Sequence, residues 1–287
     1  MDIELLRTFL EVQRTGHFGR AAANLFLTQS TVSARIRLLE TTLGEQLLER
    51  QRNNIRLTAA GQRLVTHAES IIAVWRRARQ EVGLQGPMQA SLGIAALSDI
   101  WDLTLLDWLL ALRNQLPDVA LDTCALPADS VLQQVTNGQQ DMGFVFEPKM
   151  GKELDGRIMM RIQLQMYSTR PGQHIGNVFD DTYIMVDWGT AYAFTHAREY
   201  PQARPSLAMS QGRHALDYMR RNGGTAYLPQ NLVTQPLEHG VLFSVDGAVV
   251  IERELHALWR VDNNKAALIQ KALQLFPDNS HQLAHSA

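Results

Sequence analysis

The sequence predicts an α + α/β chain of two unlike parts, a small helical N-terminal region with a short β-hairpin and a larger α/β region, joined by one long helix. Its 287 residues are more than one compact core usually organises. Apolar residues recur every three or four positions before Gly44, and again in an unbroken seam between Gly61 and Val82. We therefore expect separate modules on the two sides of the long helix.

Basic and acidic residues are unevenly distributed between these parts. Residues 1–82 hold twelve arginines and no lysine against eight acidic residues, a formal charge of +4. The rest of the chain holds fifteen basic against twenty-one acidic residues, a charge of −6, so the net charge of −2 hides a segregation. A basic segment on an acidic body is typical of a nucleic-acid-binding module attached to a second module.

The composition is that of a soluble protein. Hydrophobic residues make up 45% and charged residues 20%, and no run of about eighteen uncharged apolar residues occurs. The start, MDIELLRTFLEV, lacks the basic residues, apolar stretch and cleavage site of a secretory signal. We therefore expect a cytoplasmic protein with no membrane partner. The single cysteine, Cys124, allows no internal disulfide and no multi-cysteine metal site.

The first two predicted helices are suited to close crossing. Glu4–Gln13 carries apolar residues at helical spacing, and Thr15, Gly16 and His17 interrupt the pattern. A short helix follows from about Phe18 to Leu25, and its three consecutive alanines let another helix approach closely. Close crossing is what a helix-turn-helix requires.

A third helix, Gln29–Thr41, has the features of a recognition helix. Thr28 is a good N-cap residue, and Val32, Ile36 and Leu39 recur at a spacing that turns them toward a core. Any capped amphipathic helix turns polar residues outward, so this pattern indicates DNA binding only in context. Short polar side chains let a helix enter a major groove, and arginines reach guanine or phosphate. The residues expected to contact DNA from this helix are Thr28, Gln29, Ser30, Thr31, Ser33, Arg35 and Arg37.

The segment LLERQRNNIRLT supplies that context. It places arginines around the Asn53-Asn54 turn, with Ile55 and Leu57 alternating as in a short strand. This arrangement predicts a wing with three phosphate-contacting residues, Arg50, Arg52 and Arg56.

A long helix follows within residues 59–88, capped by Thr58 and ended by the LQGP segment at 84–87. Its regular 3-4 spacing over three heptads favours pairing with a helix outside its own domain, although packing on its own core gives the same pattern. The expected dimerisation residues are Leu64, Ala68, Ile71, Trp75, Ala78 and Val82.

Together these segments resemble the LysR-type transcriptional regulators. The resemblance rests on HFGRAAANLFLTQSTVSARIRLLETTLGEQLLER and RNNIRLTAAG, in the family's order and close to the start of the chain. RNNIRLTAAG also resembles the branch that includes regulators of flagellar genes. Ser30 stands where the family often has proline and Ala34 where it often has arginine, which affects the expected base preference and not the fold.

The resemblance extends more weakly over the remaining two hundred residues. SLGIAAL at 91–97 is similar to the first strand of the family's effector domain, and SVLQQVTNGQQDMGFVF and GGTAYLP are similar to later elements. Such domains have two α/β lobes like those of periplasmic binding proteins, with a ligand cleft between them. The implied domains are a winged helix-turn-helix at 1–58, the linker helix and hinge at 59–88, lobe I at 89–162 and 262–287, and lobe II at 163–261. The chain should cross between the lobes near Arg161–Gln163 and Arg260–Asp262.

Candidate effector-binding residues follow from the rule that α/β sheets bind ligands beyond the carboxyl ends of their strands, where helices begin. The rule selects polar residues after strands or at helix starts, and nearby aromatic residues that either line a cleft or pack in a core. Together they are Ser98, Asp99, Trp101, Ser130, Phe146, Glu147, Asp187, Thr190, Ser210 and Tyr227.

Two other classes of protein fit less well. No phosphate-binding loop, dinucleotide fingerprint, nucleophile elbow or HExxH motif occurs, and the nine histidines lack metal-ligand spacing, so we expect no enzyme, cofactor or metal. A solute-binding protein of transport type would share the two lobes but not the N-terminal module. A regulator with a vestigial cleft, acting through its abundance, stays open. The partners implied by the resemblance are double-stranded DNA, a small-molecule effector, further copies of the chain in a dimer or tetramer, and RNA polymerase.

Overall fold

The computed structural model describes residues 2–51, 54–82, 90–148 and 150–277. The chain divides into two compact units, which we describe separately. The N-terminal unit is Met1–Gly86 with the short segment Asn137–Gln139, and the C-terminal unit is Pro87–Thr136 with Gln140–Ala287. Arg52 lies outside the described residues, so its predicted place in a wing stays a prediction.

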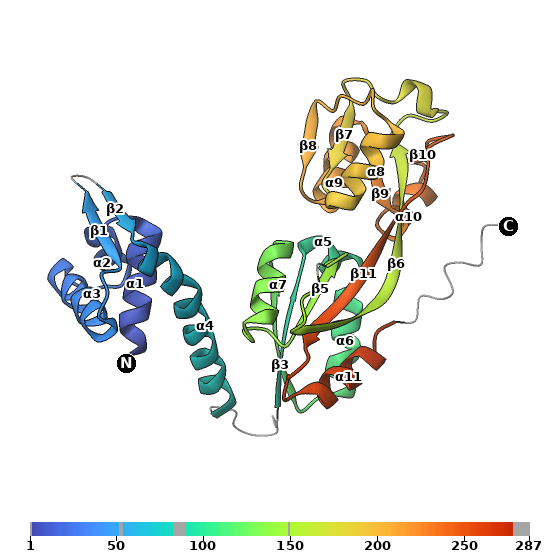
Figure 1. The fold of residues 1–287 in the computed structure, drawn as a ribbon. Coiled ribbons are helices and arrows are strands. Elements are labelled where there is room, and N and C mark those ends of the chain that lie inside the picture. Colours follow the sequence, from blue (N-terminus) through green and yellow to red (C-terminus); the bar gives the residue numbers. More distant parts are fainter. Residues whose placement is uncertain (1, 52–53, 83–89, 149, 278–287) are drawn as a thin grey trace. The chain divides into compact units, whose positions relative to one another are not determined.

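The N-terminal unit is a helical bundle with a two-stranded hairpin (Figure 1). Its elements are α1 Ile3–Thr15, α2 Phe18–Asn24, α3 Gln29–Leu43, β1 Leu48–Gln51, β2 Asn54–Leu57 and α4 Ala59–Val82. The two strands pair antiparallel from Leu48 opposite Leu57 to Gln51 opposite Asn54. This is the helix-turn-helix and wing that the sequence predicts.

The boundaries of α3 follow from its capping residues. Thr28 Oγ1 accepts a hydrogen bond from Thr31 N–H at 3.2 Å, as expected for the N-cap. Gly44 ends the helix with a φ of 72°, a left-handed conformation that glycine adopts without steric cost. Val32 and Leu39 are fully buried in the core shared with α1 and α2, so the predicted inward face is confirmed.

The C-terminal unit is built on one mixed nine-stranded sheet with the order β4-β3-β5-β11-β6-β9-β7-β8, and β10 pairs with β6. Its strands are β3 Ala90–Ala96, β4 Val119–Ala125, β5 Met142–Phe146, β6 Leu154–Ser168, β7 Tyr183–Val186, β8 Leu207–Met209, β9 Thr225–Pro229, β10 Phe243–Ser244 and β11 Ile251–Arg260. Its helices are α5 Ser98–Ile100, the π-helical η1 Trp101–Leu105, α6 Leu106–Gln115, α7 Ala128–Thr136, the 3-10 helix η2 Ile175–Asn177, α8 Thr190–Glu199, α9 Gly212–Asn222, α10 Gln230–Glu238 and α11 Ala266–Gln274.

The long strands β6 and β11 belong to both lobes of this unit. They lie side by side between a group formed by β3, β4 and β5 with their helices, lobe I, and a group formed by β7, β8 and β9 with theirs, lobe II (Figure 1). Their antiparallel pairing runs from Leu154 opposite Arg260 in lobe I to Leu164 opposite Ile251 at the start of lobe II. The chain therefore first crosses from lobe I to lobe II on β6, near the expected residues Arg161–Gln163.

The second crossing differs from the expected position near Arg260–Asp262. Arg260 pairs with Leu154 at the lobe I end of β11, whereas Ile251 lies at the lobe II end. Arg161–Gln163 on β6 lie opposite Glu252–Glu254 on β11, so the chain returns to lobe I about eight residues earlier than expected.

The last helix of the described chain completes lobe I. Trp108 Nε1 on α6 donates a hydrogen bond to the carbonyl of Ala272 on α11 at 2.9 Å. The rings of Phe144 and Phe276 stack with their centroids 6.0 Å apart. Residues at the two ends of the unit thus share one core.

Lobe II has an aromatic core that includes Tyr227. The hydroxyl of Tyr227 donates to the Val249 carbonyl at 2.8 Å and lies 2.9 Å from the Tyr200 hydroxyl, and the side chain is fully buried. Trp188 is buried beside it and donates to the Tyr227 carbonyl at 2.9 Å. The assignment of Tyr227 to the effector site was wrong, because the ring lies inside the lobe and its hydroxyl is already bonded.

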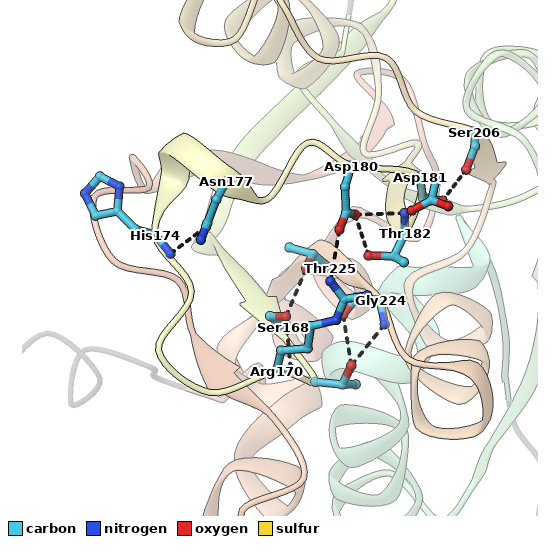
Figure 2. Close-up of polar contacts among 11 residues, drawn as sticks. Ser168, Arg170, His174, Asn177, Asp180, Asp181, Thr182, Ser206, Gly224 and Thr225 are labelled. Atoms are coloured by element: carbon cyan, nitrogen blue, oxygen red, sulfur yellow. Dashed lines mark hydrogen bonds and ion pairs between the residues drawn. The ribbon is translucent and has the colours of Figure 1, made fainter.

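A polar network fixes the connection between β6 and β7 in lobe II, and Figure 2 shows its members directed at one another. Arg170 and Asp180 form an ion pair at 3.0 Å, and Asp180 Oδ1 also accepts from the Thr182 backbone at 2.8 Å. Ser168 and Thr225 join β6 to β9 through their hydroxyls at 3.0 Å. Since these groups bind each other, we assign the network to the folding of lobe II.

Candidate nucleic-acid and effector sites

The exposed surface of α3 carries the residues predicted to meet DNA. Gln29, Ser30 and Arg37 are exposed, and Ser33 is half-buried. At the start of the helix the hydroxyls of Thr28 and Ser30 lie 2.9 Å apart, and those of Thr28 and Thr31 lie 2.8 Å apart. The first turn thus presents ordered hydroxyl groups of the kind that hydrogen-bond to base edges and phosphates.

Arg35 is the exception on this helix. Its Nη1 donates to Thr8 Oγ1 at 3.2 Å and lies 3.7 Å from Glu4 Oε2, so the side chain joins α3 to α1. We therefore remove Arg35 from the predicted base-reading residues and assign it to positioning of the recognition helix.

The hairpin places Arg56 on β2 opposite Glu49 on β1, and the Arg56 side chain is exposed. Arg50 lies on β1, but its side chain is outside what the structure describes. Arg56 thus fits the predicted phosphate contact of a wing.

The predicted seam along α4 divides into two parts. Ala68 is fully buried in the core of the N-terminal unit, and half-buried Leu64 packs against that core. The prediction that Ala68 contacts a partner was wrong, because the first turns of α4 lie against α1, whereas half-buried Leu64 stays a predicted contact. Farther along, Trp75 is 47% and Val82 88% exposed. Ile71 is also exposed and Ala78 is half-buried, so these four residues remain candidates for pairing.

Among the described residues of the C-terminal unit, two side-chain hydrogen bonds cross from lobe I to lobe II. Asp99 Oδ1, in the first turn after β3, accepts from the Gly212 N–H at the start of α9 at 2.9 Å. The Asn231 side chain donates to the Leu103 carbonyl in the π-helical segment at 2.9 Å. A side chain on residue 212 would meet the Trp188 ring at 2.5 Å, so glycine there brings the helix start close to Asp99.

Asp99 is also electrostatically unusual. Burial raises the pKa of Asp99 to about 6, and the hydrogen bond from Gly212 offsets part of that effect. A carboxyl group between two lobes that binds a proton near neutral pH makes the cross-lobe contact sensitive to charge.

The other predicted effector residues lie at the ends of strands and the starts of helices, as expected, but in different surroundings. Trp101 Nε1 donates to the Cys124 carbonyl at 3.1 Å, and Asp187 Oδ1 accepts from the Gly189 N–H at 2.9 Å. Ser98 is the first residue of α5 and Thr190 that of α8, whereas Ser130 lies within the first turn of α7. Ser210 precedes α9 by two residues and is exposed.

Arg253 on β11 is a buried arginine at the junction of the lobes that the sequence pattern did not predict. Its side chain is 2% exposed, and its Nε donates to Glu147 Oε1 at 2.8 Å. The guanidinium carbon lies 4.9 Å from the centroid of the Phe146 ring. A predicted residue, Phe146, thus forms one side of a buried cationic site at the junction of the lobes.

Within the described ranges no group of three or more histidine, cysteine, aspartate or glutamate residues is arranged to hold a metal ion. Nor does any helix in that part of the chain have the length and apolar character needed to cross a membrane.

A basic helix-turn-helix with a wing, followed by a two-lobed α/β unit with polar groups between its lobes, defines a DNA-binding transcription regulator with a ligand-binding domain. Two family models support this class: a bacterial regulatory helix-turn-helix protein of the lysR family over residues 3–62, and a LysR substrate binding domain over residues 85–280. The chain belongs to the LysR family of transcription regulators.

Individual relatives agree with this assignment. The HTH-type transcriptional regulator HdfR of Yersinia pestis (strain Pestoides F) is 35% identical over 296 residues, which cover 98% of each chain, and HdfR of Yersinia pseudotuberculosis (strain YPIII) matches equally. These relatives are transcription regulators, which supports the prediction that the chain is not an enzyme.

Solved structures share the fold. CbnR, a LysR family transcriptional regulator, has a TM-score of 0.72 at 16% identity and covers 97% of this chain and 100% of its own. Vibrio fischeri DarR in complex with DNA has a TM-score of 0.58 at 18% identity, covering 96% and 99%.

The exposed face of α3 predicts base-specific binding. Arg37→Ala and Ser33→Ala should each weaken operator binding by about 1–3 kcal/mol and alter base preference. Arg56→Ala should weaken binding to all sequences alike and lower the salt slope by about one. Fluorescence anisotropy with operator and random duplexes measures both. Equal losses on the two duplexes for all three variants would refute the assigned roles.

The exposed part of α4 predicts a helix pair in which Trp75 is buried. Trp75→Asp would place an unpaired charge in that interface and should raise the dissociation constant of the assembly at least about tenfold. Sedimentation at micromolar concentration measures the mass, with Arg76→Asp on the same helix as the charge control. Wild-type mass for the Trp75 variant would assign the seam to the unit's own packing.

The raised pKa of Asp99 predicts a pH-dependent stability of the C-terminal unit. Because the folded pKa lies above the unfolded value, protonated Asp99 stabilises the fold at low pH, and this contribution is lost as the pH rises through about 6. Asp99→Asn keeps an acceptor for Gly212 and should raise stability at pH 8 by about 1 kcal/mol relative to wild type, but not at pH 4. Urea unfolding followed by tryptophan fluorescence tests this, with exposed Asp107→Asn as the control. A pH-independent difference would contradict it.

Proposed function

We propose that this regulator changes its affinity for operator DNA when a small-molecule effector binds between lobes I and II. The observation that carries the proposal is the set of polar contacts at the junction, where Asp99 meets Gly212 and Arg253 meets Glu147. The bond between Asp99 and Gly212 joins lobe I to lobe II, so a ligand that replaces or strengthens it would shift the balance between arrangements of the lobes.

We also propose that two chains pair through α4 when they bind DNA. A pair of chains joined through the exposed part of α4 would carry two recognition helices to paired half-sites about one helical turn, or a multiple of it, apart. Trp75 and Val82 supply the apolar surface for such a pair. We further propose that the chain forms dimers or tetramers in the cytoplasm. These assemblies would act on promoter DNA together with RNA polymerase.

The identity to HdfR over nearly the whole chain and the RNNIRLTAAG segment favour flagellar genes as the first targets to examine. Genome-wide mapping of bound sites identifies the operator and its neighbouring genes.

The proposed response is tested with the full chain and that operator. A library of neutral and charged metabolites is screened for compounds that raise the melting temperature, and each is added to an anisotropy titration of operator DNA. We expect at least one to change operator affinity by about 5-fold to 150-fold, the usual range of coupling between two sites. If none changes it, the vestigial-cleft regulator is the correct alternative.

A further inference from the structure

The guanidinium of Arg253 is held in an incomplete environment. Among the described residues its Nη1 is buried and has no hydrogen-bond partner, although Nε is bonded to Glu147. A buried N–H of a charged group without an acceptor is costly, and such groups in native proteins are usually paired or occupied by a ligand.

The same guanidinium lies against the start of α8 in lobe II. A Cβ built on Gly189, the N-cap residue of α8, would lie 3.1 Å from Nη2 and 3.2 Å from Nη1. Gly189 has no side chain that could cap the first turn of α8, so the N–H groups of that turn and the positive end of the helix dipole lie beside the arginine. Two positive groups placed together in this way favour an anion bound to both.

We propose that Arg253 and the first turn of α8 bind the carboxylate of a small monoanionic effector. The planar Nη1–Nη2 edge of a guanidinium matches the two oxygens of a carboxylate. Because Gly189 has no side chain, the backbone can approach the bound group closely. Its φ of 92° would strain any other residue, so the position favours glycine.

The charges around the site select a monoanion. Glu147 already neutralises part of the charge of Arg253, and the Asp187 carboxylate binds the Gly189 N–H at the same helix start. One guanidinium and the positive end of α8 are here opposed by two carboxylates, so a single ligand carboxylate adds less repulsion than a phosphate dianion or a dicarboxylate would.

Glu147 is then an internal competitor for Arg253. It is one of two non-glycine residues with positive φ in the described chain, at 43°, and its side chain is about one-third exposed. A ligand carboxylate that takes over part of the guanidinium weakens the bond from Arg253 to Glu147 in lobe I and links the guanidinium to the N–H groups of α8 in lobe II.

This inference rests on the proposed effector control and specifies its chemistry. The probes are acetate, butyrate and phenylacetate, each compared with its neutral amide, with succinate and inorganic phosphate, and with chloride at the same ionic strength. Melting temperature and calorimetric titration of the full chain measure binding. We expect the monocarboxylates, at least one of them strongly, to stabilise the wild type and the amides not to.

Three variants separate binding from folding. Glu147→Gln removes the competing charge and should tighten carboxylate binding about tenfold. Arg253→Met combined with Glu147→Gln leaves no unpaired charge and should abolish binding. Arg161→Gln removes an exposed arginine that pairs with Glu254 on the neighbouring strand and should leave binding unchanged.

The outcomes distinguish the inference from the proposed function. Carboxylate binding that the Arg253 double variant retains, or that Glu147→Gln does not tighten, overturns the Arg253 site. An amide or another neutral compound that binds and changes operator affinity independently of Arg253 overturns the carboxylate class and leaves effector control standing. Carboxylate binding through Arg253 without any change in operator affinity supports the site and overturns effector control through it.

Discussion

The antiparallel pair of β6 and β11 is the constraint on which the C-terminal unit depends. Both strands pass through the two lobes, so the lobes share one hydrogen-bonded sheet and can change their relation only by bending or twisting that pair. Arg253 lies on this pair, opposite Ile162, and its contacts reach Glu147 in lobe I and Gly189 in lobe II. A charge change at this point therefore acts where the sheet joins the two lobes.

In the N-terminal unit, a few local contacts set the orientation of the recognition helix. Thr28 and Thr58 cap the two helices that follow them, and Arg35 ties the recognition helix to α1. The recognition surface is thus oriented by contacts that need no DNA. Specificity then depends on a few exposed side chains of α3, and the sequence departures at Ser30 and Ala34 lie on the same exposed side.

Local patterns in the sequence predicted most of this fold. Caps at Thr28 and Thr58 and the buried face of α3 are set by residues a few positions apart, where spacing is informative. The heptad pattern of α4 includes both Ala68, which is buried in its own unit, and Trp75, which is exposed. The spacing alone could not distinguish them, because a heptad pattern does not identify the helix that packs against it. Arg253 could not be found because its partners lie 106 and 64 positions earlier, at Glu147 and Gly189. Tyr227 was misplaced for a related reason, because an aromatic residue after a glycine turn fits a cleft and a core equally.

The central claim is that the arrangement of the lobes is coupled to DNA binding. It is tested most directly by spin labels on Gln133→Cys in α7 and Ala197→Cys in α8, both exposed, in a Cys124→Ser background. Labelled chains are diluted with unlabelled ones so that only distances within one chain are measured. Because coupling is reciprocal, operator DNA alone should shift the distance distribution, and random DNA should shift it less. An identical distribution with and without operator would contradict the account.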